Sequence, residues 1–146
     1  MKFVLEKVDG EEEVAIRYRQ CSPRIKKLIR HMRQFCFQLD VYQEKKMYQI
    51  PLEDIQHIEV HEKDVIVYTN NDSFVYKGSL TELEAILKHT SLCRVSKRDI
   101  VNCAYISYVE PYANHRMLLV LENEERLIVN RHYLLTLKET IKGGHI

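Results

Sequence analysis

The chain has 146 residues, of which 45% are hydrophobic and 29% charged, and a formal net charge of +1, so its composition fits one ordinary globular domain with a short appendage. No apolar run approaches the ~20 residues of a membrane span and the first residues lack a signal-peptide core, so we expect a cytoplasmic protein. The four cysteines lie far apart without a Cys-x-x-Cys pair, which argues against a structural zinc site and favours free thiols.

Residues 1–44 are predicted to form a small β-β-α appendage. Apolar or β-branched runs at 1–8 and 14–19 flank an Asp-Gly turn signal and could form a hairpin, although three consecutive glutamates would make its loop long. Such an appendage would lie outside the main domain, which we place at residues 45–146.

A helix with one apolar stripe should follow the hairpin. Ser22 and Pro23 mark its start, because serine is a good N-cap and proline is tolerated in the first turn. Apolar side chains then recur at helical spacing, at Ile25, Leu28, Ile29, Met32, Phe35 and Cys36. The opposite face is basic, and we interpret it as solvated surface rather than as a contact with DNA or lipid.

A succession of hairpin signals predicts antiparallel β structure in the main domain. The polar stretch 41–47 would join the appendage to this domain, and a β pair bent at Pro51 would follow it. The expected strands are 48–52, 55–60, 65–68 and 74–76. Ser79 and Glu82 have the spacing of a capping box, which predicts a short helix over about 80–88.

A charged loop mounted on a strand is the main feature of the segment 92–106. Three cations, Arg94, Lys97 and Arg98, directly precede an apolar β-forming run. A strand in a rigid sheet would fix where these cations point, which is what a groove-binding loop requires. A solvated basic turn is the competing interpretation of this segment alone.

The remainder of the chain predicts three more strands and a closing helix. The expected strands are 105–110, 117–121 and 127–129. Asn130 would cap the helix and Gly143-Gly144 would end it. The inner side of this helix would carry Tyr133, Leu134, Leu137 and Ile141.

The near-neutral total charge is unevenly distributed along the chain. Residues 46–87 are acidic, whereas residues 88–146 have an excess of lysine and arginine. Because phosphate would be repelled by the acidic part, a DNA-binding surface should come from the C-terminal third and have a small footprint.

Motifs of the common enzyme classes are absent from the sequence. It has no G-x-S-x-G elbow, no H-E-x-x-H pair and no phosphate-cradling glycine loop, and it contains only four glycines. His31 and Cys36 do not share a helix face well enough to chelate a metal. We therefore expect no enzymatic activity, no cofactor, no metal and no small-molecule substrate.

An ordered set of short motifs runs through the C-terminal half. A basic element at Arg94, Ser96 and Lys97 is followed by Ile-Val-Asn at 100–102, an acidic turn at 122–125, and Asn-Arg-x-Tyr at 130–133. Together with the strand pair expected in residues 50–69, this set resembles the LytTR DNA-binding domain of bacterial transcription regulators over roughly residues 46–141. No single motif is specific, but their order is.

The resemblance implies a mainly β fold, with elongated antiparallel sheets and short helices, that reads successive major grooves through three loops and bends the duplex. The first loop would be 61–64, with Lys63 or Asp64 at the reading position, and the other two would place Lys97 and Arg131 against guanine. Arg94 and Arg98 would contact phosphate or support a loop. The candidate DNA-binding residues are Lys63, Arg94, Ser96, Lys97, Arg98, Asn130 and Arg131.

The function implied by the resemblance is sequence-specific transcription regulation on double-stranded DNA by a homodimer, with residues 1–44 serving dimerisation or sensing. The chain has no room for the receiver domain that usually accompanies this family, so it resembles the stand-alone members, some of which are controlled by a membrane protein partner. A protein-interaction adaptor, with the β body as scaffold and the helix at 25–36 as docking surface, is the alternative. DNA affinity that falls with salt would distinguish the two.

Overall fold

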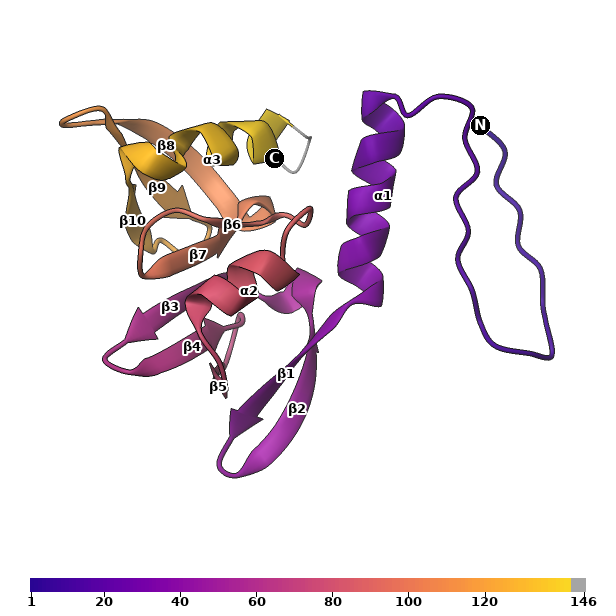
Figure 1. Ribbon diagram of the computed structural model, residues 1–146, viewed down its shortest axis with the longest axis horizontal. Helices are drawn as coiled ribbons and strands as arrows, with labels where there is room; N and C mark the ends of the chain where they lie inside the picture. The colour runs from indigo at the N-terminus through magenta and orange to yellow at the C-terminus, as the bar shows by residue number, and fades with distance from the viewer. Residues whose placement is uncertain (143–146) are drawn as a thin grey trace.

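The computed structural model describes residues 1–142, and their regular structure consists of two antiparallel sheets and three short α-helices (Figure 1). The larger sheet has the strand order β2-β1-β5-β4-β3-β7-β6, and the smaller has the order β10-β9-β8. This arrangement confirms the predicted fold class of antiparallel sheets with short helices.

The larger sheet consists of β1 (Gln38–Gln43), β2 (Lys46–Pro51), β3 (His57–His61), β4 (Asp64–Tyr68), β5 (Ser73–Tyr76), β6 (Leu92–Arg94) and β7 (Asp99–Asn102). The smaller sheet consists of β8 (Ile106–Tyr112), β9 (Arg116–Leu121) and β10 (Arg126–Val129). The helices are α1 (Pro23–Cys36), α2 (Leu80–Ile86) and α3 (Leu134–Thr140).

Residues 1–22 contain no strand, so the hairpin predicted there is not seen. The segment forms an extended loop beside α1, away from both sheets (Figure 1). An isolated two-stranded hairpin is marginal in water, and these residues have no third strand or apolar surface to pack on within the described chain. The predicted start of α1 is confirmed, because the Ser22 side chain accepts a hydrogen bond from the Ile25 backbone N–H.

The stretch 41–47 is a hairpin between β1 and β2, not a polar join. Tyr42 pairs with Met47 and Gln43 with Lys46, which leaves Glu44 and Lys45 as a two-residue turn. Both turn residues have positive φ, the backbone that a type I′ turn needs. The usual Asn-Gly signal for such a turn is missing, which explains why the sequence pattern did not indicate it.

The β pair predicted on either side of Pro51 is also wrong in its partners. β2 pairs with β1, whereas β3 pairs with β4 and β7. A 3-10 turn at Leu52–Asp54 redirects the chain between β2 and β3, and burial of Leu52 and Ile55 anchors it. The strands themselves fall close to their predicted positions.

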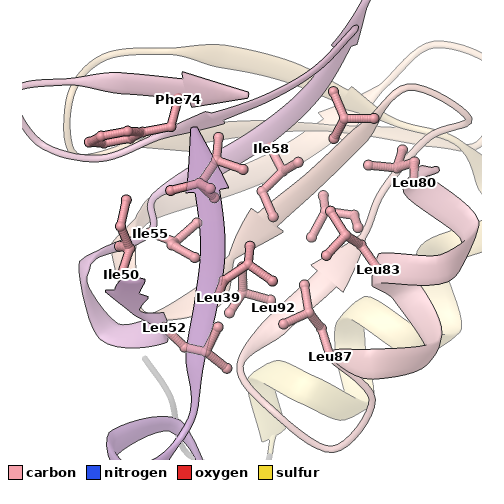
Figure 2. Close-up of a cluster of buried hydrophobic side chains, with 14 residues drawn as sticks. Leu39, Ile50, Leu52, Ile55, Ile58, Phe74, Leu80, Leu83, Leu87 and Leu92 are labelled. Carbon is pink, nitrogen blue, oxygen red and sulfur yellow. The ribbon is translucent and has the colours of Figure 1, made fainter. Parts of the chain in front are cut away.

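The first hydrophobic core lies between the larger sheet and α2. Figure 2 shows Leu83 and Leu87 pointing from α2 towards Leu39, Ile58 and their neighbours. The predicted capping box starts this helix, since the Ser79 hydroxyl accepts from the Glu82 N–H and the Glu82 carboxylate accepts from the Ser79 N–H. Capping therefore sets the position from which α2 covers the sheet.

The second core lies between the smaller sheet, α3 and the β6–β7 region. Tyr133, Leu134, Leu137 and Ile141 pack in it, as predicted for the closing helix. Asn130 precedes a 3-10 turn at Arg131–Tyr133 and makes no side-chain capping bond, which corrects its predicted role as the helix cap. The predicted Gly143-Gly144 end lies outside the described residues.

Asn102 connects the two parts of the body and is fully buried. Its Oδ1 accepts from the Ser91 hydroxyl at 2.6 Å and from the Ala104 N–H at 3.1 Å, and its Nδ2 donates to the Ile55 carbonyl at 2.8 Å. The Asn of the Ile-Val-Asn motif is therefore structural, because it satisfies backbone groups where β7 leaves the larger sheet.

The helices of the described chain are too short or too polar to cross a lipid bilayer. The four cysteines are free, as predicted: Cys21 and Cys36 are exposed, and Cys93 and Cys103 are buried.

Candidate nucleic-acid interface

The three loops singled out in the sequence lie side by side. At the first, the Val60 N–H donates to the Arg98 carbonyl at 2.8 Å. At the third, the Asn130 N–H donates to the Val95 carbonyl at 3.0 Å. The second loop, 95–98, is therefore hydrogen-bonded to both of the others, and the three form one continuous surface.

The first loop is the tight turn between β3 and β4. His61 pairs with Asp64, and Glu62 and Lys63 form the turn, with Glu62 at a φ of 59°. Lys63 is exposed between two acidic neighbours. Their charges weaken the local positive potential, so this loop is the least basic of the three.

The second loop is fixed from inside by Ser96 and Asp99. The Val95 N–H donates to the Asp99 carbonyl at 3.0 Å, the Ser96 hydroxyl donates to Asp99 Oδ2 at 2.7 Å, and the Arg98 N–H donates to Ser96 Oγ at 3.1 Å. Ser96, a candidate contact in the sequence, thus supports the loop, while the Lys97 side chain at its tip is exposed.

Asp99 is in turn held by His57, whose Nε2 lies 2.9 Å from its Oδ1. Burial alone would raise the pKa of Asp99, but hydrogen bonds from His57 and Ser96, and the charges of His57 and Arg98, outweigh it and lower the pKa below its usual value. Asp99 is therefore an ionised acceptor at the base of the loop.

Arg94 supports the second loop from the side. Its Nε donates to the Ser96 carbonyl at 3.0 Å, its Nη2 to the Lys97 carbonyl at 2.8 Å, and its Nη1 to Glu84 Oε2 at 3.1 Å. Since these bonds engage every nitrogen of the guanidinium, the geometry favours loop support over phosphate contact.

Arg98 connects the first and second loops. Its Nε and Nη2 donate to the Val60 carbonyl at 3.2 and 2.9 Å. The residue is exposed, so its remaining N–H groups face solvent while the two bonds to the Val60 carbonyl, which we call the Arg98 clamp, are kept. Its geometry allows both roles that the sequence suggested.

Three candidate cations remain unengaged in the described part of the chain. The side chains of Lys63, Lys97 and Arg131 are exposed and make no hydrogen bond or ion pair there. Each belongs to a different loop of the surface. Asn130, by contrast, is half-buried and contributes its backbone to the junction with Val95.

Sequence reasoning missed four residues, two on this surface and two that support it. His61 and His132 are exposed in the first and third loops, and their position beside Lys63 and Arg131 was a usable signal. His57 and Asp99 are 42 residues apart, so no local pattern could have paired them.

Comparison with protein families gives one match that covers most of the chain. The family described as LytTr DNA-binding domain matches residues 45–142. This range contains all three loops and both sheets except β1.

Named relatives match over the same part of the chain. The sensory transduction protein LytT of Enterococcus faecalis is 24% identical over 98 residues, which are 67% of this chain and 40% of LytT. The transcriptional regulatory protein YpdB of Escherichia coli K12 is 28% identical over 85 residues, which are 58% of this chain and 35% of YpdB. The matched part thus spans well under half of these relatives.

A solved structure shows the same fold. The LytTr DNA-binding domain of a response regulator from Bacillus cereus superposes with a TM-score of 0.65 at 23% identity, over 71% of this chain and 95% of that one.

Proposed function

Because the chain belongs to the LytTR family of DNA-binding domains, we propose that it is a transcription regulator that recognises specific duplex DNA with its three-loop surface. Membership of a DNA-binding family agrees with the absence of catalytic motifs from the sequence. The relative YpdB, which is named as a transcriptional regulatory protein, supports the regulatory part of the proposal.

The observation that carries the proposal is the set of free cations, Lys63, Lys97 and Arg131, one on each of three adjoining loops. Lysine and arginine can donate to guanine O6 and N7 in the major groove, and arginine can do so with two bonds at once. Lys97 and Arg131 are the proposed base-reading residues. Lys63 adds a weaker contact, because Glu62 and Asp64 flank it.

The other candidate residues position these cations. Arg94, Ser96 and Asp99 set the shape of the second loop, and the Arg98 clamp holds the first loop beside it. A rigid base limits the entropy lost when the loops enter a groove. Arg98 also lies where its free N–H groups can reach a phosphate.

We further propose that the regulator acts as a homodimer. A footprint of about three to five cations gives modest affinity at physiological salt, so two linked footprints are needed for tight binding. Within residues 1–44, the proposed contact is 1–36, because this part exposes apolar surface that the body does not cover, whereas β1 belongs to the larger sheet. Phe35 on the α1 stripe is 60% exposed, and Ile25 and Met32 are only half-buried.

The proposal is tested by selecting duplexes from a random library with the full chain and titrating the best site with salt in a shift assay. We expect a repeated motif to be enriched, and affinity to fall with a log–log slope of about −0.9 for each phosphate contact. A chain that enriched no motif, with an affinity unaffected by salt, would instead be an interaction adaptor.

A further inference from the structure

Three potential metal ligands converge where β3 begins. A ring nitrogen of His57 and one carboxylate oxygen each of Glu59 and Glu125 lie within 4.8 Å of one another. His57 and Glu59 are two residues apart on β3 and so share a face of the sheet. Glu125 reaches the same place from the turn before β10.

The His57 ring is placed to bind a ligand through one nitrogen. The residue is 3% exposed, and its Nε2 lies 2.9 Å from Asp99 Oδ1. Because an ionised carboxylate only accepts, Nε2 carries a hydrogen, and in the neutral ring the lone pair is on Nδ1. In the described part of the chain, Nδ1 has no hydrogen-bond partner, which is costly for a buried polar atom.

Tyr68 lies beside this cluster. Its ring stacks on the His57 ring at 5.6 Å with an interplanar angle of 18°. The carboxylate oxygens of Glu59 and Glu125 lie within 4.8 Å of each other. Two carboxylates that close repel each other, and a cation between them would relieve the repulsion.

We propose that His57, Glu59 and Glu125 bind one divalent transition metal of the zinc class. An imidazole nitrogen with two carboxylate oxygens, and water in the open position, is a ligand set that zinc accepts. The two glutamate side chains must turn inwards to reach ligand distances, and neither is fully buried, since Glu59 is half-buried and Glu125 is exposed. A carboxylate behind the ligating histidine, here Asp99, is the usual support of such a site.

The site would act on the loop that carries Lys97. Asp99 accepts from His57 through Oδ1 and from the Ser96 hydroxyl through Oδ2. Glu59 pairs with Asp99 across the sheet, directly beside the Val60–Arg98 bond. A bound ion would fix the imidazole and neutralise two carboxylates under the interface. Its effect on DNA affinity rests on the proposed function.

Zinc binding to the full chain tests the site directly. The exposed thiols are first removed by Cys21→Ser and Cys36→Ser, because they could bind zinc themselves. Calorimetric titration with Zn²⁺ should then give one ion per chain. Glu59→Gln and Glu125→Gln should each weaken binding by about tenfold or more. Glu124→Gln, in the same turn but outside the cluster, is the matched control and should bind as the parent does.

Thermal unfolding provides a second readout. Zinc should raise the melting temperature of the parent and of Glu124→Gln by the same amount and that of Glu125→Gln by less, while all three melt alike without metal. No saturable binding by the parent, or equal binding by all variants, would overturn the site. If zinc binds as expected while DNA selection enriches no motif, the proposed function fails and the metal site stands.

Discussion

The β body and the N-terminal segment differ in how far their apolar side chains are buried. In the β body, Ile58 and Leu83 are fully buried between the larger sheet and α2. In the N-terminal segment, Phe3 and Leu5 are 86% and 84% exposed. The body therefore supplies its own folding free energy, whereas the segment gains none from the apolar groups that it leaves in water.

This difference indicates where each region finds its partners. The body needs none to fold and presents a polar, basic surface of hydrogen-bonded loops. The segment carries the apolar area that a protein interface requires. This contrast is the reason why we assign DNA binding to the β body and propose residues 1–22, with the exposed edge of α1, as the contact with a second copy of the chain.

The largest expected effect is on the stability of the body. Asn102→Ala removes a fully buried amide and leaves the Ile55 carbonyl without the hydrogen bond from Asn102 Nδ2. We expect a loss of about 2–4 kcal/mol in the free energy of unfolding, because each unsatisfied buried polar group costs roughly 1–3 kcal/mol. Denaturant titration followed by circular dichroism measures it.

Asn71→Ala is the control for this substitution, because Asn71 is exposed in a turn. It should change the free energy of unfolding by no more than about 0.5 kcal/mol. Equal effects of the two substitutions would show that the buried amide does not hold the body together.

The next largest effect is expected on DNA binding. Lys97→Ala and Arg131→Ala should each weaken the binding free energy for the selected site by roughly 1–3 kcal/mol, because each removes a base contact. The difference in affinity between the selected site and random duplex should therefore become smaller. Arg98→Ala should weaken all sequences alike. Shift assays on selected and random duplexes measure both quantities.

Lys46→Ala serves as the charge-matched control, because Lys46 is exposed on β2, at the edge of the larger sheet opposite the loops. It should leave the difference in affinity between selected and random duplex unchanged. If both Lys97→Ala and Arg131→Ala kept the full difference, other residues would read the bases.

A smaller effect on stability should distinguish a residue that supports the second loop from one that contacts DNA. Arg94→Ala breaks the ion pair with Glu84 and the bonds to two loop carbonyls, so the free energy of unfolding should fall by about 1–2 kcal/mol. Lys97→Ala should leave it unchanged within about 0.5 kcal/mol, since its side chain is exposed and free. The same denaturant titration compares them, and indistinguishable stabilities would argue against the supporting role.

The smallest effect on folding should come from the N-terminal segment. Phe3→Ser together with Leu5→Ser should alter the unfolding of the monomer by less than about 0.5 kcal/mol, because both side chains are already exposed. Sedimentation at micromolar concentration should nevertheless shift from dimer to monomer. Leu135→Ser, which changes an exposed leucine on α3, should stay dimeric. A monomeric parent chain would remove the dimer from the proposal.

Local patterns in the sequence determined most of the elements of this fold. The N-cap at Ser22, the capping box at Ser79 and Glu82, and the apolar runs of β4 and β9 were all readable, because each depends on residues that lie close together along the chain. The motif order also predicted the family, since it records the succession of loops and strands.

Only the tertiary structure decided which elements pair and which charges are free. The partner of β2 is β1 rather than β3. The Arg94 guanidinium is bonded to Glu84 and to two backbone carbonyls, whereas the Lys97 side chain makes no such bond. The bond from His57 to Asp99 spans 42 residues. Such choices depend on segments that meet only when the chain has folded, because hydrogen-bond partners and burial are properties of position in space, whereas caps and turns are properties of neighbours along the chain.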